Sequence, residues 1–260
     1  MFEARLIQGS LLKMIIEAVR ELVTNANLEC SESGVSMQAM DSSHISLCKL
    51  LIRSDGFDHY RCDRSLSLGL STANIAKILK CAGNKDTVTL KAEDQGDTLI
   101  VMFESPGKDR ISEFDLKLMD IDSEHLSIPK TEYKCIIQMP SAEFARIVKD
   151  LAVIGETCDI TCSKEGVRFS VSGDLGTGSI MVKNNPSVDK EDEKVMVTMA
   201  EPLSLKFALR YLALFTKATS LGPTVTISMT PDNPVVVEYP IDTFGYVRYY
   251  LAPKIDDQEE

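Results

Sequence analysis

Four stretches of the chain repeat their apolar residues at the spacing of an α-helix. The stretches are residues 10–23, 72–82, 141–154 and 204–218. A helix advances about 100° per residue, so in the third stretch Phe144, Ile147, Val148 and Leu151 fall on one side. The pattern predicts four helices, each with one face against a core.

Between these stretches, short runs alternate apolar and polar residues. In "TVTISM", Val225, Ile227 and Met229 share one side, and "GVRFSVSG" has the same pattern. Such alternation is typical of strands with one solvated face, and it favours antiparallel sheets. The expected fold class is therefore α+β.

The order of these elements repeats along the chain. Gly34 and Gly166 occupy equivalent places after the first and third helical stretches, and Thr87 and Thr224 do so after the second and fourth. The repeat predicts two similar domains of antiparallel sheets with two helices each. We expect an N-terminal domain at 1–117, a linker at 118–135 and a C-terminal domain at 136–260 that ends in an acidic tail. The linker is acidic, contains a proline and lacks periodicity, so it should lie on the surface.

The charge of the chain is unevenly distributed. A net charge of −11 over 260 residues argues against nucleic acid if the charge is spread evenly. However, each helical stretch places basic residues away from its apolar face. These residues are Lys13, Arg20, Lys77, Lys80, Arg146, Lys149, Lys206, Arg210 and Lys217. On a single helix this is an ordinary solvated face, whereas four related helices with the same placement favour a shared anionic ligand.

Duplex DNA is the polyanion that such helices would suit. If they line one surface, their cations neutralise phosphates and release counterions whatever the base sequence. The basic faces have no dense set of Asn, Gln or aromatic residues for reading or stacking bases. The sequence therefore predicts contact with the DNA backbone without sequence specificity.

Catalytic and metal-binding motifs are not found. The seven cysteines form no C-x-x-C pair, and Cys158 and Cys162 lack the partners of a zinc site, which favours reduced thiols in an intracellular protein. The three histidines have no metal-ligand spacing, and the Gly-rich "GDLGTGS" does not open a helix as a phosphate loop must. The start of the chain does not resemble a secretory signal, and no apolar run is long enough for a membrane span. We expect no catalysis, no metal and no cofactor.

Long stretches of the sequence resemble one known family. "GVSMQAMDSSHISLCKLLIRSDGF" (34–57) and "RCDRSLSLGLSTANIAKILKCAGN" (61–84) closely resemble the two signature stretches of the eukaryotic proliferating cell nuclear antigen (PCNA) family. "FALRYLALFTKAT", "PVVVEY" and "YYLAPKI" agree as well, so the likeness covers essentially the whole chain. It implies a nuclear sliding clamp: a homotrimer, closed head to tail around DNA, that serves replicative DNA polymerase as a processivity factor.

The resemblance also assigns residues to three surfaces. The DNA-facing set it implies is Lys13, Arg20, Lys77, Lys80, Arg146, Lys149, Arg210 and Lys217. The implied trimer interface comprises Arg110, Phe114, Leu175, Gly178 and Ile180. The implied hydrophobic pocket for partners comprises Met40, His44, Ile45, Leu47, Leu126, Ile128, Tyr133, Pro234, Tyr250, Ala252 and Pro253. Without the family, Met40, Leu47 and Tyr250 would be interpreted as core residues.

The partners implied are replication and repair proteins that carry a short hydrophobic-aromatic motif. They include DNA polymerase, the clamp loader, flap endonuclease and DNA ligase, which would dock a helical turn in the pocket. Lys164 matches the family's lysine for ubiquitin or a related modifier, a mark linked to translesion synthesis. Met14 and Val153 stand where many relatives carry basic or polar groups. Two alternatives remain open: a scaffold that does not encircle DNA, and a subunit of a heterotrimeric checkpoint-type clamp.

Overall fold

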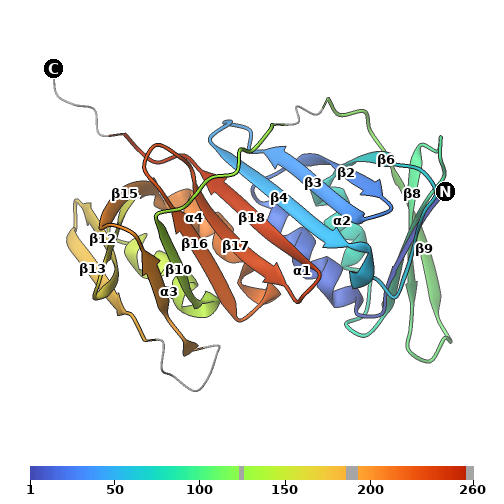
Figure 1. Ribbon diagram of the computed structural model, residues 1–260. Coiled ribbons are helices and arrows are strands. Elements are labelled where there is room, and N and C mark those ends of the chain that lie inside the picture. The colour runs from blue at the N-terminus through green and yellow to red at the C-terminus, as the bar shows by residue number, and fades with distance from the viewer. Residues whose placement is uncertain (123–125, 186–192, 256–260) are drawn as a thin grey trace. The chain divides into compact units, whose positions relative to one another are not determined.

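The computed structural model describes residues 1–122, 126–185 and 193–255. The chain forms two compact units, which are described separately below. The first contains residues 1–126 and 240–247, and the second contains 127–239 and 248–260. Figure 1 shows the helices and the strands with their labels.

The first unit is built from nine strands and two α-helices within its described residues. In chain order these are β1 (Phe2–Leu6), α1 (Gly9–Arg20), β2 (Asn25–Ser31), β3 (Gly34–Met40), β4 (Ser46–Arg53), β5 (His59–Cys62), β6 (Leu66–Ser71), α2 (Thr72–Leu79), β7 (Thr87–Ala92), β8 (Thr98–Glu104) and β9 (Ile111–Lys117). A short 3-10 helix, η1 (Ser54–Gly56), follows β4. One sheet has the order β5-β1-β7-β8-β9, and β4-β3-β2-β6 are neighbours in another. The strand pairs are antiparallel, and β9 forms an edge.

The second unit has the same components. They are β10 (Cys135–Pro140), α3 (Ser141–Leu151), β11 (Thr157–Ser163), β12 (Gly166–Gly173), β13 (Gly176–Lys183), β14 (Met196–Met199), β15 (Leu203–Ala208), α4 (Leu209–Phe215), the 3-10 helix η3 (Thr216–Leu221), β16 (Thr224–Met229), β17 (Val235–Ile241) and β18 (Gly245–Leu251). One sheet has the order β13-β12-β11-β15, and β14-β10-β16-β17-β18 are consecutive neighbours in another.

The predicted repeat is present in the element order. A strand, a helix and three strands follow one another from β1, from β6, from β10 and from β15. Gly34 and Gly166 have φ angles of 137° and 143°, which side chains of L-residues rarely adopt. A Cβ atom would lie 2.2 Å from the Ile52 oxygen at the first and 2.1 Å from the Val182 oxygen at the second. The same strand–strand contact thus requires glycine in both units.

The predicted helix faces are buried. Four apolar side chains of α3 are at most 2% exposed: Phe144, Ile147, Val148 and Leu151. The centre of the Phe144 ring lies 6.3 Å from the centre of the Phe169 ring on β12. The mixed helix and antiparallel sheet composition confirms the expected α+β class.

The fourth helix differs from the prediction. The sequence predicted a helix over 204–218, but residues 203–208 form β15 and the helix begins at Leu209. In "LSLKFA" the apolar residues alternate, and this strand pairs with β11, placing Lys206 opposite Asp159. Lys206 therefore does not belong to the basic face of α4. The sequence of residues 203–208 fits a strand as well as a helix, and pairing with β11 selects the strand.

Candidate nucleic-acid interface and partner surfaces

In the first unit, four predicted cations lie on α1 and at the end of α2, two helices that contact each other. Lys77 and Lys80 are exposed and Lys13 is half-buried. Ser71 starts α2, since its hydroxyl accepts a hydrogen bond from the Asn74 amide at 3.4 Å. The buried face of each helix packs against the core, so the lysines are left on the solvent side.

Arg20 differs from its neighbours because two carboxylates compensate its charge. Its Nε lies 2.7 Å from Glu17, and its NH2 group lies 3.1 Å from Glu21. A phosphate would have to compete with these acids. Arg20 should therefore contribute less to anion binding than Lys77 or Lys80.

In the second unit, the other four predicted cations are all exposed. Arg146 and Lys149 lie on α3, Arg210 lies on α4, and Lys217 lies on η3; α3 contacts both α4 and η3. The Arg210 guanidinium lies 4.8 Å from the centre of the Tyr211 ring, and one of its nitrogens donates to the Tyr211 hydroxyl at 3.4 Å. The ring therefore orients the guanidinium while leaving it exposed to solvent. Arg146 is 3.8 Å from Asp150, a solvent-exposed contact of little energetic value.

Each unit thus presents four basic side chains on neighbouring helices. They are spread along the helices without a stacking aromatic surface, an arrangement suited to phosphates rather than to bases. Val153, just beyond α3, is 71% exposed, so the apolar side chain noted in the sequence analysis is open to solvent. Met14 is half-buried on α1.

A hollow of about 470 Å³ lies in the first unit beside β2, β3 and the start of the linker. Met40, His44 and Leu126 line it, as predicted for the partner pocket, and Ile45 is exposed nearby. Asn27 donates to the Ile121 oxygen at 2.9 Å, and Gln38 donates to the Leu126 oxygen at 2.9 Å. These two amides fasten residues 121 and 126 to strands β2 and β3.

Asp41 shapes the loop that carries His44. Its carboxylate accepts the amide hydrogens of Ser43 at 3.1 Å, Ile45 at 2.8 Å and Ser46 at 2.7 Å. These bonds hold His44 at a positive φ of 55°. The sequence reasoning missed Asp41, Asn27 and Gln38, whose side chains position the hollow rather than present an apolar surface.

The remaining predicted pocket residues are distributed as follows. Leu47 does not line the hollow: it is 8% exposed on β4, where it belongs to the buried face of the strand. In the second unit Pro234 and Ala252 are exposed, and Ile128, Tyr133, Tyr250 and Pro253 are half-buried. Desolvation raises the pKa of the Tyr133 hydroxyl, as expected for a ring partly covered by protein.

The predicted interface residues lie on or beside the strands at two sheet edges. Phe114 is on β9, where its ring packs 5.6 Å from Phe103, and Arg110 precedes this strand. Leu175 precedes β13 and is 79% exposed, while Gly178 and Ile180 lie on β13 itself. The sequence reasoning missed Ile111, which is 60% exposed on β9. Edge strands with unpaired backbone and exposed apolar side chains are poised to pair with another chain.

Two family models match the chain over nearly its full length. The model described as "Proliferating cell nuclear antigen, N-terminal domain" matches residues 1–125, and "Proliferating cell nuclear antigen, C-terminal domain" matches residues 127–254. The chain belongs to the PCNA family. It is therefore a DNA sliding clamp.

Three further features of this PCNA-family chain concern metal ligands, thiols and the length of its helices. Among the described residues, no group of three or more His, Cys, Asp or Glu is placed to hold a metal ion. All seven cysteines are unpaired, and Cys81 alone is exposed. Burial raises the pKa of the Cys30 and Cys158 thiols to about 12, so they stay protonated and unreactive at neutral pH. No described helix is both long enough and apolar enough to cross a bilayer.

Lys164 lies in the turn between β11 and β12, and its side chain is exposed. The Glu165 amide donates to the Ser163 hydroxyl at 3.3 Å, which helps to order this turn. An exposed lysine in an ordered turn is accessible to a modifying enzyme. The acidic tail expected at the end of the chain lies outside the described residues beyond residue 255.

Proposed function

We propose that three copies of this chain close head to tail into a ring around duplex DNA in the nucleus of a eukaryotic cell. The ring acts as a processivity factor for replicative DNA polymerase and as a docking platform for replication and repair proteins. One observation carries this proposal: each unit ends one of its sheets in an exposed strand, β9 in the first and β13 in the second.

The two edges differ, so the contact between copies is heterologous. β9 of one copy pairs with β13 of the next, and Ile111 and Phe114 pack against Leu175 and Ile180. Heterologous contacts form a closed ring when the rotation between copies divides a full turn. Three two-unit chains give six similar units, whose basic helices face the DNA.

The other proposed roles use the remaining surfaces. Clients with a short hydrophobic-aromatic motif place a helical turn against Met40, His44 and Leu126, with the second unit's predicted pocket residues completing the contact. These clients include the polymerase, the clamp loader, flap endonuclease and DNA ligase. Lys164 receives ubiquitin or a related modifier, which supports translesion synthesis.

The mass of the purified chain in solution tests ring formation. Light scattering should give three times the chain mass of 28.7 kDa. A checkpoint-type clamp that needs two other kinds of subunit would remain monomeric, and that result would reject the homotrimer. The variant Leu175→Asp should abolish the trimer. Ile7→Asp should leave it intact, because Ile7 is also exposed, at 57%, and follows β1, which β7 and β8 separate from the edge strand β9.

A further inference from the structure

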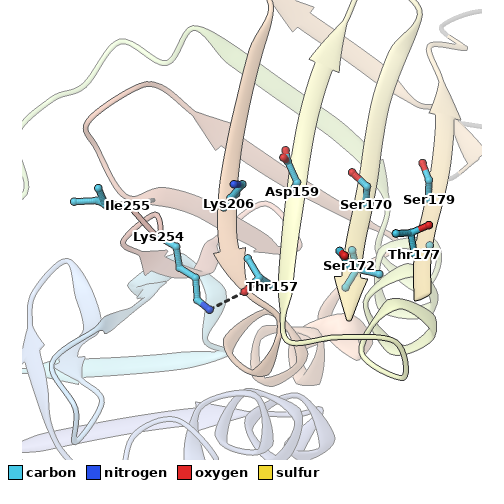
Figure 2. Close-up of a pocket in the computed structure, with 11 residues that line it drawn as sticks. Thr157, Asp159, Ser170, Ser172, Thr177, Ser179, Lys206, Lys254 and Ile255 are labelled. Atoms are coloured by element: carbon cyan, nitrogen blue, oxygen red, sulfur yellow. Dashed lines mark hydrogen bonds between the residues drawn. The ribbon is translucent and has the colours of Figure 1, made fainter. Parts of the chain in front are cut away.

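A hollow of about 680 Å³ lies over the sheet β13-β12-β11-β15 in the second unit, and of the residues assigned above to DNA, partners or the trimer interface only Gly178 lines it. Figure 2 shows Lys206, Asp159, Ser170 and Ser179 projecting from four neighbouring strands. Their register is continuous: Lys206 is opposite Asp159, Asp159 opposite Ser170, and Ser170 opposite Ser179. The floor is thus a row of polar side chains that crosses the whole sheet.

Two lysines occupy the β15 end of this row. Lys206 belongs to β15, and the Lys254 ammonium donates to the Thr157 hydroxyl at 2.7 Å. Asp159 is the single carboxylate among the lining residues, and it accepts hydrogen bonds from the hydroxyls of Thr161 and Ser204. The ammonium groups exceed the carboxylates, so the hollow suits an acidic occupant.

The chain itself leads an acidic segment to this place. The Lys254 amide donates to the Lys206 oxygen at 2.8 Å, which ties residue 254 to β15. Ile255 lines the hollow and is 89% exposed, although an apolar side chain gains from being covered. The residues that follow, 256–260, read "DDQEE", four carboxylates in five positions.

We propose that residues 256–260 bind in this hollow, with their carboxylates beside Lys206 and Lys254. Five extended residues span about 17 Å, and four neighbouring strands span about 14 Å, so the segment is long enough to cross the sheet. Binding covers Ile255 and places carboxylates beside both ammonium groups.

Carbodiimide cross-linking of the full-length protein tests this proposal, because the reagent joins a carboxylate only to an amine in contact with it. At low salt, peptide mapping should find links from residues 256–260 to Lys206 or Lys254. Links to Lys164, which is exposed and outside the hollow, should be absent. At about 0.5 M salt, where the Debye length is about 4 Å, the links should fall several-fold.

A second measurement separates binding from mere proximity. Removal of residues 256–260 should raise acetylation of Lys206 and Lys254 by an amine-reactive ester several-fold and leave Lys164 unchanged. Equal amounts of ¹⁵N-labelled and unlabelled protein show whether the links lie within one chain. Absence of the links, unchanged acetylation after removal, or links found only between chains would overturn the proposal; the last result would place the segment on a neighbouring copy.

Discussion

The guanidinium of Arg210 lies 4.8 Å from the centre of the Tyr211 ring, so one exposed cation on α4 is held by its own neighbour in sequence. Arg20 on α1 is held instead by Glu17 and Glu21. The two arginines therefore keep different amounts of uncompensated charge for the DNA contact proposed above. This difference allows the DNA contacts to be tested residue by residue.

Replacement of Arg210 by Ala should weaken DNA binding more than replacement of Arg20 by Ala. Loss of one phosphate contact lowers the slope of log K against log salt by about 1. Arg20→Ala removes a charge that Glu17 and Glu21 already compensate. Its effect on the attraction for phosphate should therefore be smaller. Titration of a labelled duplex at several salt concentrations measures both slopes, and equal slope changes would contradict this account.

Combined replacement of Lys77, Lys80, Arg210 and Lys217 by Ala should reduce retention on DNA without affecting assembly. These side chains are exposed, so their loss should change stability by less than about 0.5 kcal/mol each. Light scattering and client-peptide binding should match those of the unchanged protein. If trimer and peptide binding are lost too, the residues have a structural role.

Replacement of Asp41 by Ala should weaken client-peptide binding about tenfold, because three backbone amides lose their acceptor and the loop around His44 loosens. Calorimetric titration with a peptide that carries the hydrophobic-aromatic motif measures the change. Asp58→Ala serves as a control, since Asp58 does not line this hollow. Unchanged affinity in Asp41→Ala would show that the hollow is not the docking surface.

Gly34→Ala and Gly166→Ala should each destabilise the protein by more than about 2 kcal/mol, because a Cβ atom meets a carbonyl oxygen at a positive φ. Gly96→Ala should change stability far less, since the atom nearest to an added Cβ is the Glu93 Cβ at 3.4 Å and the nearest carbonyl oxygen is 3.6 Å away. Thermal unfolding measures the three variants side by side. Similar melting temperatures for all three would refute the steric argument.

Alkaline pH should destabilise the fold through its buried thiols. Cys30 and Cys158 have a folded-state pKa of about 12, above the ordinary 9.0. Above pH 9 the unfolded chain loses these protons and the folded chain keeps them, so stability falls between pH 9 and 12 by up to about 1.4 kcal/mol per pH unit for each thiol. Urea unfolding over this range measures the loss. Cys30→Ser should make the dependence shallower.

The repeat made much of the fold predictable, because equivalent positions in the two units are under the same steric and burial constraints. Gly34 and Gly166 are examples, as are the buried faces of the helices. The limits appear at Lys206, where sheet pairing decided between strand and helix, and at Leu47, where the alternation of β4 placed an expected pocket residue in the core. Asn27 and Gln38 were not predictable, since they bond to residues about 90 positions away in the sequence. Asp41 was missed although its bonds lie within its own loop, in "DSSHIS". The exposed edges of β9 and β13 required the strand order, which no local pattern contains.

Retention on topologically closed DNA tests the central claim most directly. The protein is loaded onto a nicked circular plasmid by a clamp loader with ATP and separated from free protein by gel filtration, and half of the sample is then linearised with a restriction enzyme. An encircling clamp that contacts only the backbone should stay on the circle and slide off the linear form. Equal retention on circular and linear DNA would contradict the account.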